Sequence, residues 1–296
     1  MFHYIDGNFL LQKGTPTMRR IVSLLLAALM LLSLTALFAG CGSKEGNYLR
    51  VGMECAYAPY NWSQKTDANG AVQIADSSNY AYGYDVIVAK KIAAELGYDG
   101  VLVYQIDWDT LPLAVNAGKV DCVIAGQSIT ADRAEQVDFT VPYYYASIVS
   151  LVKADGQYAN AKSISDFAGA RAISQINTVW NDTCIPQIPN VNHLTPAETS
   201  GAMIVNLTSG NADLVVTDLP TAMAAVAVYP ELKLVAFTGT DGDFQVSDEE
   251  INIGISCKKG NTELVEKINS VLSKMTVDDF EDMMDEAIRV QPLNQN

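Results

Sequence analysis

A short sequence pattern occurs twice in this chain, first in residues 113–126 and again in residues 205–218. Each copy consists of the end of a helix, a glycine, a short turn, an aspartate and an apolar strand. The glycines, Gly118 and Gly210, suit the left-handed conformation that closes a helix. Uninterrupted apolar strands are typical of a parallel sheet that is buried on both faces. The repeat therefore predicts an α/β protein with two similar lobes.

The order of elements before the first copy agrees with this fold class. Residues 49–53 are predicted to form a strand, residues 84–96 a helix that Gly97 ends, and residues 101–105 the next strand. A strand, a helix and a second strand in this order indicate a parallel sheet. Ligands of open α/β sheets bind beyond the carboxyl ends of the strands. The strand ends at Gly126-Gln127-Ser128 and Thr217-Asp218 therefore predict a cleft between the lobes.

Two helices are expected near the C-terminus, over residues 263–274 and 277–288. Apolar residues recur at helical spacing across the first of them, which is typical of a face packed on a core. This stripe consists of Leu264, Ile268, Val271, Leu272 and Met275. We expect both helices to pack onto the first lobe.

The N-terminus carries a predicted export signal, residues 1–40. Arg19 and Arg20 precede an almost continuous apolar segment, residues 21–39, which small residues and Cys41 follow. This order is typical of a cleaved signal. The junction resembles that of bacterial lipoproteins, in which the cysteine becomes a lipidated N-terminus. Cys41 is therefore the expected lipidation site at the start of a tether, residues 41–47, and Met18 is the expected true start.

A transmembrane anchor is the alternative for the apolar segment, because its length could just cross a bilayer. No basic stop-transfer flank follows it, which favours the signal. Removal of residues 1–40 leaves 16 of the 19 basic and 33 of the 34 acidic residues, a formal net charge of −17. A strongly acidic protein repels the phosphates of nucleic acid, which argues against nucleic acid as a partner.

Metal and histidine chemistry have little support in the composition. His193 is the one histidine beyond the predicted signal, and the cysteines show neither CxxC pairs nor zinc-ligand spacing. We expect no metal and no cofactor. Buried free thiols are the favoured interpretation for Cys55, Cys122, Cys184 and Cys257, and a disulfide is the alternative.

Six motifs in this order resemble the bacterial solute-binding proteins for polar amino acids, the extracytoplasmic receptors of ABC importers. They cover nearly the whole chain after the predicted signal. The motifs are Gly52-Met53-Glu54-Cys55-Ala56-Tyr57-Ala58-Pro59-Tyr60, Gly83-Tyr84-Asp85, Asp107-Trp108-Asp109, Ala125-Gly126-Gln127-Ser128-Ile129-Thr130-Ala131-Asp132-Arg133, Val137-Asp138-Phe139-Thr140-Val141-Pro142-Tyr143-Tyr144 and Asp213-Leu214-Val215-Val216-Thr217-Asp218.

The resemblance implies two lobes of a type II periplasmic-binding-protein fold, joined by two hinge strands near residues 145–149 and 246–250. Lobe 1 is expected to comprise residues 48–146 and 250–296, and lobe 2 residues 147–249. The implied function is capture of a free amino acid by a lipid-anchored monomer outside the cell membrane. The implied partners are this ligand and the membrane subunits of an ABC permease.

An amino acid receptor must hold a carboxylate and an ammonium group at once. Arg133 is the leading carboxylate partner, because a guanidinium can donate two parallel hydrogen bonds. Thr130 is expected to cap a helix whose first N–H groups join the same anion site, and Ser128 adds a hydroxyl and an N–H. A plain helix-surface arginine is the alternative.

Asp218 and the Gly126 carbonyl are the expected acceptors for the ammonium group, and Asp218 could instead be a helix N-cap. Thr178 matches the threonine with which the second lobe of the family reaches the carboxylate. The family usually has glycine or serine where Asn177 stands.

Aromatic residues flank the ligand's aliphatic part in this family, and Tyr57 and Tyr84 stand at those positions. Glu54 matches the acidic residue that faces the ligand's side chain in relatives binding lysine, arginine or glutamine; a solvated surface carboxylate is the alternative. A basic or amide ligand is therefore expected. The chain leaves Tyr60, Trp62, Trp108 and Trp180 without an assigned role.

Enzymes on the same fold are the competing class. A lytic transglycosylase would need a further catalytic domain, and a sensor ectodomain fits poorly with lipidation. A prephenate-type or cyclohexadienyl dehydratase needs only one well-placed carboxylic acid, which Glu54 or Asp218 could supply. The expectation is a receptor without enzymatic activity, with the dehydratase as the alternative.

Overall fold

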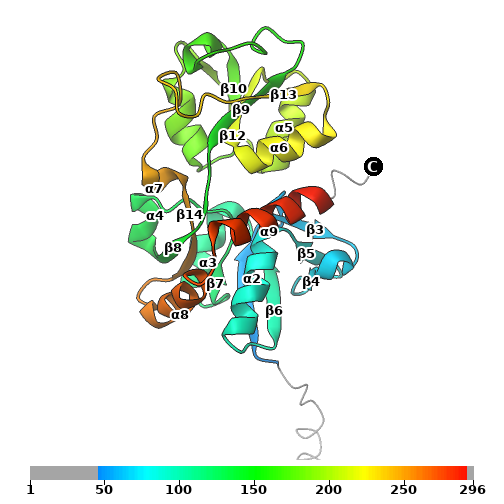
Figure 1. Cartoon of the computed structure of the whole chain (residues 1–296), viewed down its shortest axis with the longest axis vertical. Coiled ribbons are helices and arrows are strands. Elements are labelled where there is room, and N and C mark those ends of the chain that lie inside the picture. Colours follow the sequence, from blue (N-terminus) through cyan, green and yellow to red (C-terminus); the bar gives the residue numbers. More distant parts are fainter. Residues whose placement is uncertain (1–45, 292–296) are drawn as a thin grey trace, which may run out of the picture. The chain divides into compact units, whose positions relative to one another are not determined.

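A computed structural model describes residues 46–291, which contain two five-stranded sheets and one four-stranded sheet (Figure 1). The first five-stranded sheet has the order β6-β1-β7-β14-β8, with β1 parallel to β6 and β7, and β14 antiparallel to β7 and β8. Its strands are β1 (Tyr48–Met53), β6 (Gly100–Gln105), β7 (Cys122–Val123), β8 (Val137–Tyr145) and β14 (Asn252–Lys258). The two strands predicted before the repeat are confirmed as β1 and β6.

The second five-stranded sheet repeats much of this plan in the order β11-β10-β12-β9-β13. Here β10 is parallel to β11 and β12, and β9 is antiparallel to β12 and β13. Its strands are β9 (Ile148–Lys153), β10 (Arg171–Ile173), β11 (Asn192–His193), β12 (Leu214–Asp218) and β13 (Leu232–Val235). The mixed α/β fold predicted from the repeat is confirmed.

The sequence repeat is also a structural repeat. Gly118 and Gly210 both have left-handed backbones, with φ of 75° and 80°, and the strands that follow are β7 and β12. The aspartates extend the repeat further. Asp121 pairs with Arg50 of β1, and Asp213 pairs with Arg171 of β10; each aspartate also accepts a hydrogen bond from the backbone N–H of its arginine. Each sheet thus carries the same arginine–aspartate tie at the amino ends of corresponding strands.

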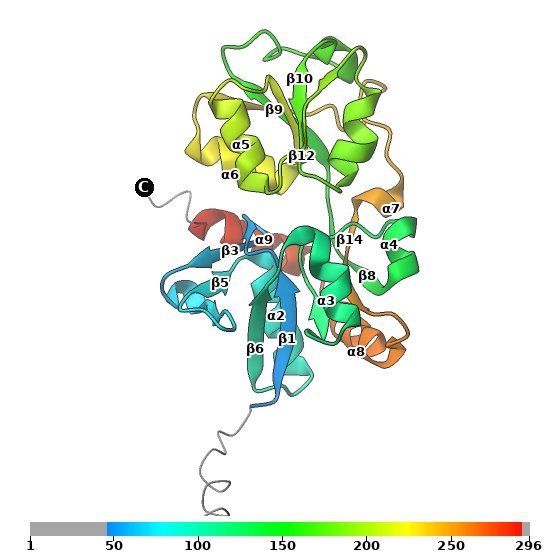
Figure 2. The same ribbon diagram turned by 180° about the vertical axis from the view of Figure 1, so that it is seen from behind.

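Helices flank both sheets, as Figures 1 and 2 show. The predicted helices are confirmed as α2, α8 and α9. In α8, Ile268, Val271 and Leu272 are buried and Leu264 is partly buried against the core; Met275, which follows the helix, also packs there. The bounds are α2 (Tyr84–Glu95), α3 (Leu111–Asn116), α4 (Ala131–Gln136), α5 (Ser200–Thr208), α6 (Leu219–Val228), α7 (Asp248–Ile251), α8 (Thr262–Leu272) and α9 (Val277–Val290). Short 3₁₀ or π turns cover Ala68–Gly70, Trp108–Thr110, Ile164–Phe167, Trp180–Cys184 and Ile185–Gln187.

The segment between β1 and α2, for which no element was predicted from the sequence, has structure of its own. It forms a small antiparallel sheet of order β2-β3-β5-β4. Its strands are β2 (Ala56–Tyr57), β3 (Asn61–Gln64), β4 (Val72–Gln73) and β5 (Tyr80–Tyr82). Gly83 joins this sheet to α2 with φ of 125°, and a Cβ there would lie 2.3 Å from the Tyr60 carbonyl oxygen. Only glycine fits so close a backbone approach.

The chain passes twice between the five-stranded sheets. It leaves the first sheet after β8, which ends at Tyr145, and enters the second with β9 at Ile148. It returns through residues 236–251. The return was expected to contain a strand near residues 246–250, but the helix α7 lies there, with Ser247 and Glu250 forming a capping box. Because α7 spans the expected boundary at residue 250, the exact lobe limits stay a prediction.

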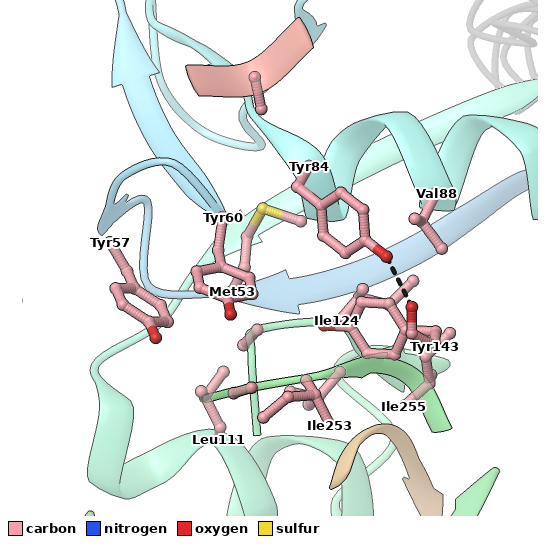
Figure 3. Packing of buried hydrophobic residues seen from close by; sticks show 14 of the residues in the cluster. Met53, Tyr57, Tyr60, Tyr84, Val88, Leu111, Ile124, Tyr143, Ile253 and Ile255 are labelled. Atoms are coloured by element: carbon pink, nitrogen blue, oxygen red, sulfur yellow. Dashed lines mark hydrogen bonds between the residues drawn. The ribbon is translucent and has the colours of Figure 1, made fainter. Parts of the chain in front are cut away.

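An aromatic core surrounds the carboxyl end of β1 (Figure 3). The rings of Tyr84 and Tyr143 stack with centroids 5.6 Å apart, and Met53 and Ile124 are fully buried in the same cluster.

The four cysteines of residues 46–291 are buried free thiols, and Cys122 of β7 lies opposite Cys257 of β14 in the ladder. No helix in this part of the chain is long and apolar enough to span a membrane; Cys41 and the predicted signal lie outside the described residues.

Candidate functional site

The predicted site residues, apart from Tyr84, gather where strands of the two five-stranded sheets end. Segments after β1, β6 and β7 meet segments after β10 and β12; the two copies of the repeat predicted the ends of β7 and β12. Four side-chain hydrogen bonds join these segments. Tyr57 donates to Asp218, Gln175 to Glu54, Arg133 to the Asn177 carbonyl, and Asn177 to Asp109.

Arg133 stands at the centre of this meeting point. Thr130 caps α4 by accepting from the Arg133 backbone N–H at 3.4 Å, as predicted. The guanidinium donates to the Ser128 carbonyl at 3.0 Å and the Asn177 carbonyl at 2.8 Å, and it lies 5.3 Å from the Trp108 ring centre. Burial lowers its pKa to about 10, so it stays cationic at neutral pH. The side chain is half-buried and bonded to two backbone carbonyls, which differs from a freely solvated helix-surface arginine.

Asp218 ends β12 and is fully buried. It caps α6 by accepting from the Thr221 N–H at 2.9 Å, so the N-cap interpretation is confirmed. The Thr221 hydroxyl at 3.1 Å and the Tyr57 hydroxyl also donate to it. Burial raises the Asp218 pKa above its usual range. All these donors are neutral, and within residues 46–291 Asp218 forms no ion pair.

Glu54, directly after β1, is only 7% exposed, so the alternative of a solvated surface carboxylate is wrong. Its side-chain donor is the Gln175 amide, at 3.2 and 3.4 Å from the two carboxylate oxygens. Burial is the main cause that raises the pKa of Glu54 to about 7; the Gln175 hydrogen bond opposes this shift, and the nearby charges of Asp107 and Asp109 add to it. A carboxyl group in this state changes charge near neutral pH.

The aromatic residues are arranged differently from the prediction. Tyr57 reaches the site and stacks on Tyr60 with ring centres 4.6 Å apart. Tyr84 does not reach it, because its ring is fully buried and its hydroxyl donates to the Tyr143 carbonyl at 2.6 Å (Figure 3). The expected flanking role of Tyr84 is therefore not supported, and Trp180, 6.0 Å from Tyr57, lies at the site instead.

Gly126, Ser128 and Thr178 lie beside these side chains. Gly126 has φ of 64°, and a Cβ there would lie 2.6 Å from the Tyr57 ring, so the close approach requires glycine. Thr178 donates to the Gln175 carbonyl at 2.7 Å. Asn177 has φ of 56°, a left-handed backbone that glycine and asparagine adopt more readily than other residues. Asparagine at this position is thus compatible with the left-handed backbone seen here.

A small cavity and a larger groove adjoin the site. The cavity has a volume of about 10 Å³, enough for roughly one water molecule; its lining residues are Tyr57, Trp108, Gly126, Ser128, Arg133, Gln175, Thr178, Val179 and Trp180. The groove, of about 680 Å³, is bounded in part by Arg133 and Asn177 and by the acidic residues Asp109, Asp132, Asp182, Glu249 and Glu250. An amino acid could enter the cavity only after the segments around it separate.

Sequence reasoning assigned no role to Gln175, Trp108, Trp180 or Asp109, all of which lie at the site. For Gln175 a signal existed, because it follows β10 as Glu54 follows β1. The binding roles of the eight predicted residues stay predictions. Within the described residues, no group of cysteine, histidine and acidic side chains is arranged to hold a metal ion.

Comparison with known proteins places the chain among transport proteins. It is 27% identical over 247 residues to a putative ABC transporter arginine-binding protein 2 of Escherichia coli, covering 83% of this chain and 93% of that protein. It is 25% identical over 235 residues to the L-cystine-binding protein TcyJ of the same species, covering 79% and 80%.

Solved structures of amino acid-binding proteins are also similar to this chain. An ancestral arginine-binding protein bound to arginine matches with a TM-score of 0.64 and 29% identity, covering 81% of this chain and 97% of that one. An ancestral amino acid-binding protein described as a precursor of cyclohexadienyl dehydratase matches with a TM-score of 0.65 and 27% identity, covering 82% and 96%. The model of the bacterial extracellular solute-binding proteins, family 3, matches residues 49–286, and the chain belongs to this family.

Proposed function

We propose that this protein captures a free amino acid outside the cell membrane and delivers it to the permease of an ABC importer. The names of its relatives, which include arginine- and cystine-binding proteins of ABC transporters, support this class of ligand. The charges of the site further support a zwitterionic ligand.

The site contains one cation and two anions that are not paired with one another. Arg133, Asp218 and Glu54 form no ion pair within 4 Å among residues 46–291. Buried charges are costly unless they are paired. A ligand that supplies the opposite charges would offset this cost. A zwitterion supplies two of them, a carboxylate for Arg133 and an ammonium group for Asp218.

The third charge bears on the ligand's side chain. If the carboxylate and ammonium groups occupy Arg133 and Asp218, Glu54 is left for the side chain. A cationic side chain balances it, an amide donates to it without balancing the charge, and an acidic one repels it. We therefore propose a basic amino acid as the ligand, with an amide-bearing amino acid second.

Lobe closure accompanies binding in this proposal, with lobe 1 as residues 48–146 and 250–296 and lobe 2 as residues 147–249. Tyr57 and Arg133 would act from one lobe, Thr178 and Asp218 from the other, so neither lobe alone surrounds the ligand.

We further propose that residues 1–40 are removed, that Cys41 is lipidated, and that the protein works as an anchored monomer. Tyr84 would support the site from the core.

A thermal-shift screen of the twenty amino acids tests the function, with titration calorimetry of those that stabilise. Arginine and lysine are expected to raise the melting temperature most, glutamine less, and glutamate and aspartate least. Mass spectrometry of ligand released from the denatured, purified protein checks the answer independently. Failure of every amino acid to bind would contradict the proposal.

A dehydratase is the second candidate, favoured by the solved neighbour described as a precursor of such an enzyme and by the raised pKa of Glu54. A carboxylic acid with a pKa near neutrality can donate a proton to a leaving group. Incubation with prephenate or arogenate and detection of the aromatic product decides this candidate. We expect no turnover; turnover that Glu54→Gln abolishes would replace the receptor by an enzyme.

A further inference from the structure

The contact between Gln175 and Glu54 joins the ends of corresponding strands in the two sheets. Glu54 directly follows β1, and Gln175 lies two residues beyond β10. Both side chains are buried, with exposures of 7% and 2%. The Gln175 amide nitrogen lies 3.2 and 3.4 Å from the carboxylate oxygens of Glu54, and Gln175 also lines the small cavity beside Arg133.

A neutral amide is a weak partner for this carboxylate. The other titratable groups that act on Glu54, Asp107 and Asp109, are acidic, and no ion pair of Glu54 occurs within residues 46–291. A cationic donor would form a charge-assisted hydrogen bond about twice as strong as a neutral one. Gln175 thus satisfies Glu54 without matching its charge.

We infer that the Gln175 amide occupies the place of the ligand's side-chain donor and must be displaced from Glu54 when the ligand binds. The inference rests on the proposed function and adds a specificity-determining residue to it. After displacement, the Gln175 amide still has a hydrogen-bond acceptor, because its nitrogen also lies 3.2 Å from the Glu198 carbonyl oxygen. The amide group therefore does not become isolated when it releases Glu54.

This exchange determines which ligand side chains gain binding free energy at Glu54. An amide side chain replaces one neutral donor by another and gains little. A guanidinium or ammonium group replaces a neutral donor by a charged one and gains the charge-assisted bond. An apolar side chain offers no donor and leaves Gln175 in place. Gln175 thereby favours cationic side chains over amides of similar length.

The test compares L-arginine with L-norvaline, which has the same three-carbon stem without the guanidinium. Gln175→Met keeps an unbranched side chain but removes the amide, so the ligand-free protein loses the Glu54 contact. We expect arginine to bind this variant about fivefold more tightly than wild type, the equivalent of one ordinary hydrogen bond. Norvaline should not bind more tightly, because it does not displace Gln175.

Calorimetry at about pH 8, above the pKa of about 7 of Glu54, measures arginine directly and norvaline by competition. Gln187→Met is the matched control, because the Gln187 amide donates to the carbonyls of Thr183 and Gln245 and accepts from the Gln245 N–H, away from Glu54; it should leave the arginine-to-norvaline ratio at the wild-type value. Gln175→Leu serves as a second amide-free variant if Gln175→Met fails to fold by circular dichroism.

Weaker or unchanged arginine binding in the amide-free variant would show that Gln175 holds the ligand or only supports the fold. An equal change for both ligands would exclude the exchange as well. If the wild type binds an amino acid but neither arginine nor lysine, the proposed function stands and this inference is wrong. If it binds no amino acid, the proposed function itself fails.

Discussion

Three carboxyl groups are buried near the site, and burial raises the pKa of each. Glu54 and Asp85 have pKa values of about 7, and that of Asp218 is also raised. Asp85 accepts hydrogen bonds from the Tyr143 hydroxyl at 2.6 Å and the Asn61 amide at 2.7 Å. An acid with a raised pKa binds more protons in the folded than in the unfolded state. Its contribution to stability is therefore present at low pH and is lost as pH rises towards its folded pKa.

We expect the melting temperature of the ligand-free protein to fall as pH rises from about 5 to about 8, because Glu54 and Asp85 lose their protons in this window. Glu54→Gln removes one of these groups and keeps an acceptor for Gln175, so its melting temperature should fall less over the same range. Differential scanning fluorimetry at several pH values measures both slopes. Identical slopes for the two proteins would place the pKa of Glu54 outside this window.

Arg133→Ala should abolish most of the affinity. It leaves the ligand's buried carboxylate without its charged partner, a loss of about 2–5 kcal/mol or roughly 30-fold and more. Arg289→Ala, which removes an exposed arginine of α9, is the control and should bind as the wild type does. Calorimetry with the best ligand from the screen checks both. An affinity within a few-fold of wild type for Arg133→Ala would remove this residue from the site.

The sequence could predict the charged residues of the site better than the aromatic ones. Arg133 and Asp218 were found because capping patterns and strand ends fix where their backbones lie. The role of an aromatic residue depends on the direction of its side chain. Tyr84 turns into the core towards Tyr143, while Tyr60 stacks on Tyr57, and neither direction is encoded in a local pattern.

At the scale of the elements, the arginine–aspartate ties Arg50–Asp121 and Arg171–Asp213 stabilise the two sheets in the same way. Each aspartate follows a left-handed glycine and joins two parallel strands through side-chain and backbone hydrogen bonds. The ion pairs are partly exposed, so the Coulomb attraction contributes little. The bonds to the backbone N–H groups of Arg50 and Arg171 contribute more of the stabilisation, because they close the strand ends.

Asp121→Ala should lower the free energy of unfolding by about 1 kcal/mol, the usual contribution of one hydrogen bond, without changing ligand affinity. Asp213→Ala should act in the same direction. Urea denaturation monitored by circular dichroism measures the stability, and calorimetry the affinity. A large loss of affinity in either variant would mean that the ties position the site as well as the sheets.

Long elements with clear periodicity, such as α2, α8 and β1, were predictable. The four-stranded sheet was not, because β2 and β4 have two residues each and too few positions for an alternating pattern. The helix α7 was missed for a similar reason. It spans four residues, and its capping box at Ser247 and Glu250 was assigned to a hinge strand on the basis of the family resemblance.

At the scale of the whole molecule, the hydrogen bonds between the two sets of strand ends compete with the ligand. Tyr57–Asp218, Gln175–Glu54 and Arg133–Asn177 use groups that the proposed function assigns to binding or to its surroundings. Such contacts hold the segments together around a cavity of about 10 Å³, so an open population is needed for ligand entry.

Ligand binding should lower the radius of gyration, because an open population is drawn into the closed form. Small-angle scattering with and without saturating ligand measures the change, and the Arg133→Ala protein at the same ligand concentration is the control. An unchanged radius in the wild type, with binding confirmed by calorimetry, would indicate a rigid site that exchanges ligand through local motions.

Cys41→Ser should abolish membrane attachment in the native host, because the variant lacks the sulfur that carries the lipid. Deletion of residues 1–17 should leave attachment intact if Met18 is the true start. Fractionation followed by detection of the protein in the membrane and released fractions measures both. Normal membrane retention of Cys41→Ser would contradict the lipid anchor and favour a transmembrane one.

The ladder that places Cys122 opposite Cys257 has a consequence for the oxidation chemistry of the chain. Both thiols are inaccessible, and burial raises the pKa of each, that of Cys257 to about 12. Thiolate, the species that oxidants attack, is therefore scarce in the folded protein. Crosslinking of this pair therefore requires the buried core around β7 and β14 to open to solvent first. A Cys122–Cys257 disulfide found in protein recovered from oxidising surroundings would thus indicate that this core had opened.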